Sequence, residues 1–196
     1  NIYPTYDMVK AIVSHEKSLE LNKEKLLVIS PDTGAMDRAI YYAGALGVDV
    51  GLFYKRRDHS TIVNGKNPIV QHEYMGRDVA DKDVLIVDDM IASGESVIDI
   101  AKELKKRNAR NVYVAATFGF FTEGVERFNK FYEDGIISRI YCSNLTYVSP
   151  ELNDAPWFHG VDISELCSRI INRLNHGRSI SKYMDATRII HDLLNE

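Results

Sequence analysis

The chain alternates short apolar runs, rich in β-branched residues, with longer stretches whose apolar residues recur every three or four positions. The clearest pair is "VLIVD" (84–88), an apolar run, and "ESVIDIAKELKKR" (95–107), whose apolar residues share one helical face. Continuous apolar strands separated by helices predict an α/β fold. Its central, mainly parallel sheet would carry helices on both faces.

The other expected elements follow the same alternation. Further strands are predicted at 26–30, 49–54, 67–74, 112–117, 139–143 and 158–163. Further helices are predicted at 35–46, 124–133 and 164–177, the last with Gly177 as its C′ residue. In sheets of this kind, ligands bind beyond the carboxyl ends of the strands. That rule selects the loops 31–35, 55–66 and 89–96 as places for chemistry.

Composition narrows the class of partner. The net charge of −4 gives no reason to expect a nucleic-acid or membrane surface. No apolar run approaches the roughly 20 residues of a membrane span. Cys142 and Cys167 form no CxxC pair, so we expect buried structural thiols and a cytoplasmic protein. The chain starts at Asn1 without an initiator Met, which favours a piece of a longer protein.

The loop after 84–88 has the composition of a phosphate and sugar site. Small residues that enter a helix N-terminus expose backbone N–H groups, and with the helix dipole these form an anion site. The hydroxyls of Ser93 and Ser96 would add hydrogen bonds, and Asp88 and Asp89 would accept hydrogen bonds from two ribose hydroxyls. The alternative is an ordinary strand end with Ser93 as the N-cap and solvated aspartates.

The stretch "VLIVDDMIASGESV" (84–97) resembles the phosphoribosyl-binding motif of type I phosphoribosyltransferases. It is most similar to the D-D-M-I-D-T-G-G-T form of the ribose-phosphate pyrophosphokinases. The resemblance implies a ribose 5-phosphate site made of Asp88, Asp89, Ala92, Ser93, Gly94, Glu95 and Ser96. Ala92 stands where that family has an aspartate, and Glu95 where it has a glycine. A carboxylate beside a phosphate cradle repels the phosphate unless it points outward.

Two other loops resemble the same family. "YKRRDHSTIVNGKN" (54–67) is similar to its mobile catalytic loop, which implies that Lys55 and Arg57 are the catalytic cations. "SPDTGAMDRA" (30–39) resembles its pyrophosphate loop, which implies roles for Asp32, Thr33 and Gly34 and places Mg²⁺ on Asp32. The cations would stabilise charge on a transferring phosphoryl group.

The resemblance continues through "ATFGFFTEGVERF" (116–128), where Phe118 replaces a histidine, and "RLNHGRSISKYM" (173–184). It implies one phosphoribosyltransferase-like domain over 1–184, the C-terminal half of a longer protein, with an additional amphipathic helix over 185–196. The expected partners are ATP, ribose 5-phosphate, the missing N-terminal domain and further copies in a homo-oligomer.

The histidine and aromatic residues give little further evidence for a metal site or a nucleotide site. None of the six histidines has metal-ligand spacing, and only His59, in the expected mobile loop, is placed to meet a nucleotide. Trp157 and Tyr147 are candidates for a base-stacking wall, although core packing is the simpler expectation.

Three functional interpretations remain open. The first is a pyrophosphokinase domain, inactive when isolated, that transfers pyrophosphate from ATP to ribose 5-phosphate. The second is a phosphoribosyltransferase that uses phosphoribosyl pyrophosphate and a base. The third is a non-catalytic module that binds ribose phosphates. The departures from the family at Ala92, Glu95 and Phe118 favour it, and so does Ala35, which replaces the second glycine of the pyrophosphate loop.

Overall fold

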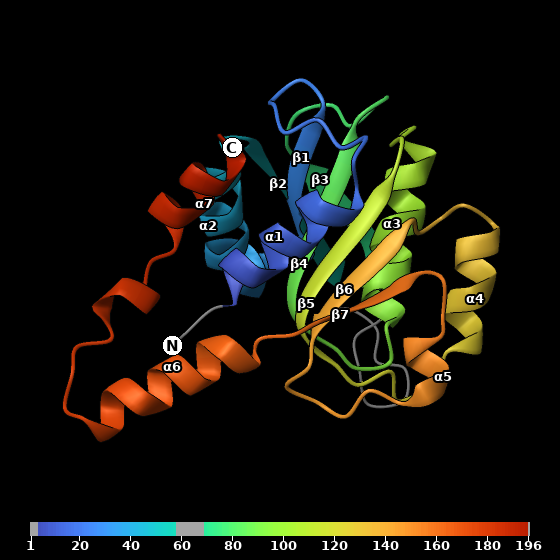
Figure 1. Ribbon diagram of the computed structural model, residues 1–196. Helices are drawn as coiled ribbons and strands as arrows, with labels where there is room; N and C mark the ends of the chain where they lie inside the picture. Colours follow the sequence, from blue (N-terminus) through green and yellow to red (C-terminus); the bar gives the residue numbers. More distant parts are fainter. Residues whose placement is uncertain (1–3, 58–68, 196) are drawn as a thin grey trace.

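One seven-stranded sheet, in the order β3-β2-β1-β4-β5-β6-β7, organises the computed structural model, which describes residues 4–57 and 69–195 (Figure 1). The strands are β1 (Leu26–Ser30), β2 (Asp49–Arg57), β3 (Ile69–Met75), β4 (Asp83–Ile91), β5 (Val112–Gly119), β6 (Arg139–Ser143) and β7 (Phe158–Val161). The β2–β3 pair is antiparallel, and the other neighbouring pairs are parallel. The predicted fold class is confirmed.

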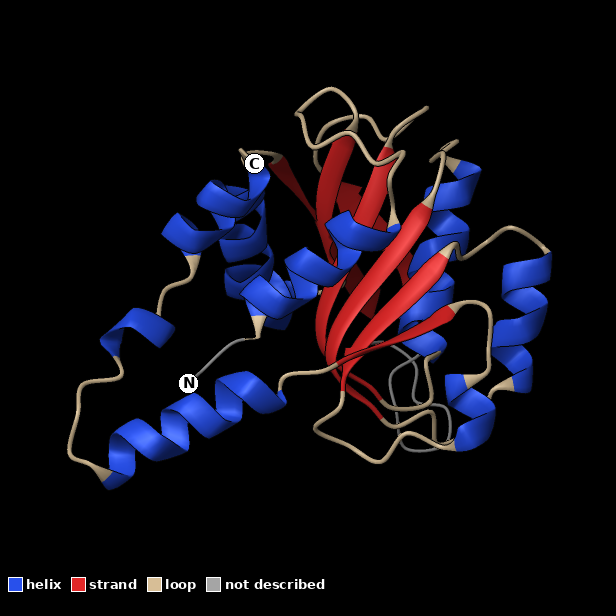
Figure 2. Cartoon of the chain, viewed as in Figure 1, coloured by secondary structure: helices blue, strands red, loops and turns tan. Residues whose placement is uncertain are grey.

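Helices cover both faces of the sheet (Figure 2). One face packs against α1 (Thr5–His15), α2 (Met36–Leu46) and α7 (Thr187–Leu194). The opposite face packs against α3 (Glu95–Lys106), α4 (Glu126–Glu133) and α5 (Pro150–Asn153). Two short 3₁₀ turns, η1 (Thr33–Ala35) and η2 (Ser181–Tyr183), and the helix α6 (Ser164–Asn175) complete the described chain.

The apolar runs are continuous because their residues feed two cores. In β4, Val84 and Ile86 join the cluster beneath α3, whereas Leu85 and Val87 join the cluster beneath α1 and α2. A strand that is buried on both faces has no side exposed to solvent, so polar residues do not alternate with apolar ones along it. This burial accounts for the sequence pattern that predicted the parallel sheet.

The start of β4 is held by a buried carboxylate. Asp83 is 1% exposed and accepts hydrogen bonds from Nε and Nη2 of Arg110 at 2.8 and 2.7 Å. Asn111 Nδ2 donates a third hydrogen bond to Asp83 at 2.9 Å. A buried charge costs little only when its lone pairs are satisfied, and here three donors satisfy it. The cluster fixes the loop before β5 against the amino end of β4.

Several element boundaries differ from the predictions. β2 continues to Arg57 because it pairs with β3, and β4 continues to Ile91 because it pairs with β5 as far as Gly119. The helices α1 and α5 were not predicted. The predicted helix 164–177 ends at Asn175, and Gly177 adopts a φ of +61°, in keeping with its expected C′ position.

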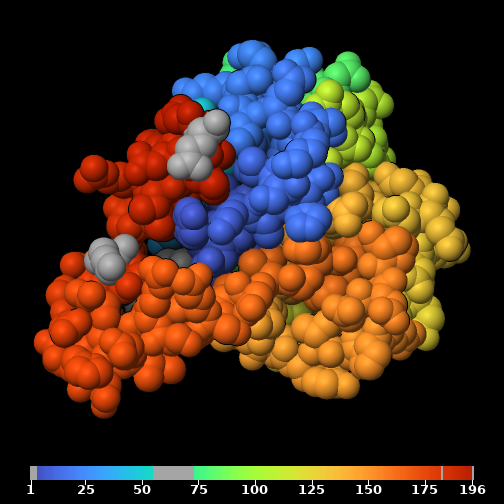
Figure 3. Space-filling model, viewed as in Figure 1, coloured from blue at the N-terminus to red at the C-terminus, as the bar shows by residue number. Residues whose placement is uncertain are grey.

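The C-terminal segment lies beside the N-terminal helix (Figure 3). The Tyr41 hydroxyl donates to Asp185 Oδ1 at 3.2 Å, and the Ala186 N–H donates to the same hydroxyl at 2.7 Å. A cavity of about 430 Å³ separates α1 from α6 and α7, with Tyr6 and Tyr183 in its walls. No helix within residues 4–57 and 69–195 has the length and apolar character needed to cross a membrane.

Candidate functional site

The strand order creates a crevice between the carboxyl ends of β1 and β4. From β1 the chain proceeds to β2 on one side, whereas β4 is followed by β5, β6 and β7 on the other side. Loops leaving neighbouring strands in opposite directions open a crevice at this switch point, which is where α/β sheets bind ligands. Asp32 follows β1, and Asp88 and Asp89 belong to β4. The structure therefore brings together two of the three predicted loops.

The predicted sugar-binding aspartates lie inside β4 and not at its end, which corrects the expected loop boundary. Asp88 pairs in register with Ala116 of β5, and pairing continues to Ile91. The segment after Asp89 is held by the residues that follow β5. The N–H of Phe120 donates to the Ile91 carbonyl at 2.9 Å, and the N–H of Thr122 donates to the Ala92 carbonyl at 3.0 Å. These bonds hold the loop where it turns toward α3.

Gly94 is required by both conformation and packing. It precedes α3 with a φ of +82°, in the left-handed region that glycine tolerates best. A Cβ atom there would lie 2.1 Å from Cζ of Phe128, which comes from α4. Gly94 also holds the N-cap position that the alternative interpretation gave to Ser93, whose Oγ accepts from the Glu95 N–H at 3.4 Å. The alternative is therefore wrong in its choice of N-cap.

The N-terminus of α3 is open to solvent. Ala92, Glu95 and Ser96 are exposed, whereas Ser93 is half-buried. The first N–H groups of an α-helix lack intrahelical acceptors and carry the positive end of its dipole. The 92–96 segment therefore has the local structure of an anion site. The exposed Glu95 carboxylate belongs to its first turn.

Asp88 has an unusual electrostatic environment. Its pKa is raised to about 6, chiefly by burial and in smaller part by the neighbouring Asp89 and Asp32. The N–H of Asp89, which donates to Asp88 Oδ1 at 2.8 Å, acts in the opposite direction. Asp32, two residues after β1, contributes to this shift, in keeping with the parallel pairing of β1 and β4. Cations or hydroxyl donors in the crevice would relieve this repulsion.

The loop after β1 is shaped by Asp32. Its Oδ1 accepts hydrogen bonds from the N–H groups of Gly34 and Ala35, at 2.9 and 3.1 Å, and caps η1. The Ser30 hydroxyl donates to the Asp32 carbonyl at 2.7 Å. Thr33 and Gly34 are exposed at the tip. Among residues 4–57 and 69–195, no hydrogen bond to Asp32 Oδ2 is found.

These carboxylates fit a weakly chelated divalent cation better than a closed metal cage. Among residues 4–57 and 69–195, no group of three or more His, Cys, Asp or Glu side chains is arranged to hold a metal. Mg²⁺ prefers oxygen ligands and often takes one or two carboxylates together with substrate phosphates and water. Asp32 and the exposed Asp89 supply donors of that type.

The third predicted loop is described only at its beginning. The backbones of Lys55 and Arg57 lie in β2, paired with β3, so the expected loop starts later than position 55. The side chains of these two residues, and His59 with the rest of 58–68, lie outside the described residues.

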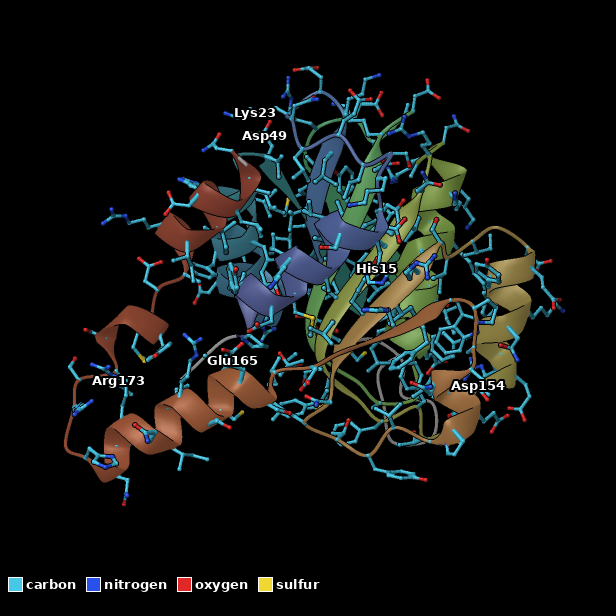
Figure 4. The ribbon with its side chains drawn as sticks, in the orientation of Figure 1. His15, Lys23, Asp49, Asp154, Glu165 and Arg173 are labelled. Atoms are coloured by element: carbon cyan, nitrogen blue, oxygen red, sulfur yellow. The ribbon has the colours of Figure 1, made fainter. Side chains whose placement is uncertain are left out.

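The aromatic, histidine and cysteine side chains considered in the sequence analysis are placed as follows. Trp157 is fully buried and its Nε1 donates to Asn129 Oδ1 at 2.7 Å, so it belongs to the core, whereas Tyr147 is 81% exposed. His15, labelled in Figure 4, lies against the sheet with its ring centroid 3.9 Å from that of His159. Cys142 is a buried free thiol, and Cys167 is free and half-buried.

Sequence reasoning missed the residues that shape the loop from a distance. Phe128, Phe120 and Thr122 contact the 91–94 segment, and all three come from beyond β5. No local pattern marks these contacts. The one available signal was the run of phenylalanines in "ATFGFF", directly after an apolar strand.

Residues 6–134 match the model of the phosphoribosyl transferase domain, and the chain belongs to this family. It is also similar to ribose-phosphate pyrophosphokinases. That of Mycoplasma pneumoniae is 33% identical over 82% of this chain and 47% of the relative. That of Thermococcus kodakarensis is 37% identical over 68% of this chain and 47% of the relative. The chain thus spans about half the length of these curated relatives.

A solved structure agrees with the fold. The crystal structure of phosphoribosylpyrophosphate synthetase from Mycobacterium smegmatis superposes with a TM-score of 0.70. The sequence identity is 21%, and the match covers 89% of this chain and 51% of the other. At that identity the comparison supports the architecture, the seven-stranded sheet with helices on both faces.

Proposed function

We propose that the chain is one half of a ribose-phosphate pyrophosphokinase and binds ribose 5-phosphate at 88–96. The observation that carries the proposal is that Asp32, directly after β1, and Asp88 and Asp89, in the neighbouring parallel strand β4, lie at the switch point beside the N-terminus of α3. Asp88 and Asp89 accept the ribose hydroxyls. The backbone of Ala92, Ser93, Gly94, Glu95 and Ser96 receives the 5-phosphate.

In this proposal the ribose 1-hydroxyl attacks the β-phosphorus of ATP, and AMP leaves. Lys55 and Arg57 approach the transferring group as its cations, because such a transfer depends mainly on positioning and charge stabilisation. Asp32, Thr33 and Gly34 form the pyrophosphate loop. Mg²⁺, held by Asp32 and the substrate oxygens, would neutralise phosphate charge.

The proposal extends to the rest of the protein. The relatives are about twice as long as the span they share with this chain, so we assign ATP binding partly to an N-terminal domain outside this sequence. We also propose a domain over 1–184 with an additional helix segment over 185–196. A cytoplasmic location and a homo-oligomeric assembly complete the proposal.

Activity assays test this reaction. The isolated 1–196 chain, given ATP, ribose 5-phosphate and Mg²⁺, is expected to release no AMP above background, whereas the full-length protein releases AMP and forms phosphoribosyl pyrophosphate. Robust product formation by the isolated chain would contradict the assignment of ATP binding to a further domain. Base-dependent release of pyrophosphate from phosphoribosyl pyrophosphate would instead indicate a phosphoribosyltransferase.

A second candidate, a non-catalytic module that binds ribose phosphates, is favoured by one feature. Glu95 is exposed in the first turn of α3, where it places a negative charge next to the phosphate cradle. Ribose 5-phosphate binding without product formation by the full-length protein would support this candidate.

A further inference from the structure

The cavity of about 430 Å³ beside α1 is a second place where a small molecule fits. It lies between α1, α6, η2 and α7, and none of its lining residues belongs to the proposed ribose site at 88–96. Figure 3 shows the surface hollowed between the blue α1, the orange α6 and the red C-terminal segment. Ligand cavities commonly measure about 300–1,000 Å³ and combine apolar walls with a few converging polar groups.

Part of the cavity wall is apolar. Leu166 from α6, and Ala186 and Ile189 from the α7 segment, contribute aliphatic surface. Tyr6, on α1, and Tyr183, in η2, add aromatic rings. These residues can cover an apolar group as large as a phenyl ring, because aromatic and aliphatic side chains both pack well against one.

Two of the charged groups in the wall already satisfy each other. Arg169 forms an ion pair with Glu165, four positions earlier on α6, and its side chain also hydrogen-bonds to Tyr183. The positive and negative charges of this pair balance, so they leave no net charge for a ligand to match.

Asp7 and Lys10 are the other charged groups in the wall, and they differ from that pair. They stand three positions apart on α1, so they are neighbours on one face of the helix. Among residues 4–57 and 69–195, neither side chain takes part in an ion pair. The Lys10 Nζ atom lies 6.0 Å from the centroid of the Tyr6 ring, which is also part of the wall. One negative and one positive group therefore remain available side by side.

The Asp7 carboxyl is the group that gains most from a ligand. It is half-buried, and burial raises its pKa, with smaller contributions in the same direction from Glu165 and Asp162. Lys10 acts in the opposite direction without forming an ion pair. A positively charged ligand group beside Asp7 would favour the ionised carboxylate.

We propose that this cavity binds a free α-amino acid with an apolar side chain, its ammonium group on Asp7 and its carboxylate on Lys10. A single carbon atom joins the two charged groups of such a ligand, which suits two opposite charges one helical turn apart. A simple amine would leave Lys10 unmatched, and a simple carboxylate would leave Asp7 unmatched. The ligand side chain lies against Leu166, Ile189 and the tyrosine rings. Because the cavity shares no residue with the ribose site, the ligand is an effector and not a substrate.

The ammonium contact sets the expected size of the effect. Hydrogen bonds to charged groups correspond to about a 10- to 150-fold change in affinity. Asp7→Asn should therefore weaken L-phenylalanine at least about tenfold. Lys10→Gln should weaken it by up to about fivefold, because Lys10 is exposed and exposed ion pairs contribute less.

The test is titration calorimetry of the full-length protein with L-phenylalanine, L-leucine, phenethylamine and 3-phenylpropionate. Phenethylamine is phenylalanine without its carboxylate, and 3-phenylpropionate is phenylalanine without its ammonium group. The matched control for Asp7→Asn is Asp37→Asn, which removes an exposed carboxylate from the first turn of α2. Thermal unfolding checks that both variants fold, and a bound amino acid should raise the Tm of the wild type.

We expect at least one of the two amino acids to bind, more tightly than either single-charge analogue, with the loss of affinity confined to Asp7→Asn. The inference is overturned if neither amino acid binds, if Asp7→Asn and Asp37→Asn bind them equally, or if phenethylamine binds as tightly as phenylalanine. Titration with ribose 5-phosphate separates this inference from the proposed function. Ribose 5-phosphate binding without amino-acid binding refutes the inference alone, and the reverse result refutes the proposed function alone.

Discussion

The packing of Gly94 against Phe128 makes Gly94→Ala a severe test of the loop geometry. A Cβ atom at this position would lie 2.1 Å from Phe128 Cζ, and the backbone has a φ of +82°. The left-handed conformation costs a non-glycine residue about 1–2 kcal/mol. Forcing a methyl group into a packed contact costs about 1–3 kcal/mol more. We expect the free energy of unfolding to fall by about 2–5 kcal/mol.

The control for this prediction is Gly135→Ala. Gly135 also has a positive φ, +67°, but a Cβ atom there would meet nothing within 4 Å. It therefore measures the conformational cost alone, about 1–2 kcal/mol. Urea unfolding gives the free energy of unfolding of both variants for comparison. In thermal unfolding of a chain of this length, each kcal/mol corresponds to a change of about 2–4 °C in Tm. Equal destabilisation by the two substitutions would mean that Phe128 does not pack against the loop before α3.

Three further predictions concern charges. Asp88→Asn should stabilise the fold above pH 7 by up to about 3 kcal/mol, from a pKa raised from 3.8 to about 6. The advantage should disappear in urea unfolding at pH 4, because the wild-type stability from the protonated carboxyl is present below pH 3.8 and lost as pH rises through about 6. Glu95→Gly should raise ribose 5-phosphate affinity severalfold in calorimetry if its carboxylate faces the cradle, and an unchanged affinity would mean that it points away. Arg110→Ala should lower the free energy of unfolding by about 2–3 kcal/mol, because it leaves the buried Asp83 carboxylate underpaired; a loss below about 0.5 kcal/mol would refute that role.

The parallel sheet could be predicted because its cause is local. Strands buried on both faces are continuous apolar runs, and β1 and the first half of β4 have that composition. Strand ends could not be predicted, because pairing with a neighbour decides them. β4 continues through Asp88 and Asp89 because β5 pairs with it as far as Gly119.

The candidate site was predictable only in part, for a related physical reason. Asp32, Asp88 and the small residues before α3 can be recognised from the sequence, because of their residue types and because they follow apolar runs. The reason that position 94 is glycine lies in α4, where Phe128 occupies the space of a side chain. The exposure of Phe120 likewise depends on tertiary packing, which the pattern of apolar residues in the sequence does not contain.

The most direct test of the central claim is ribose 5-phosphate binding to the full-length protein and two charge-matched variants. Asp89→Asn removes an exposed carboxylate in the crevice, and Asp134→Asn removes an exposed carboxylate at the end of α4, before the amino end of β6. Losing hydrogen bonds to a charged group costs about 1.5–3 kcal/mol, which is roughly a 10- to 150-fold change in affinity. We predict that loss for Asp89→Asn and less than about a twofold change for Asp134→Asn. Equal affinity in all three proteins, or no binding to the wild type, would contradict a ribose-phosphate site at 88–96.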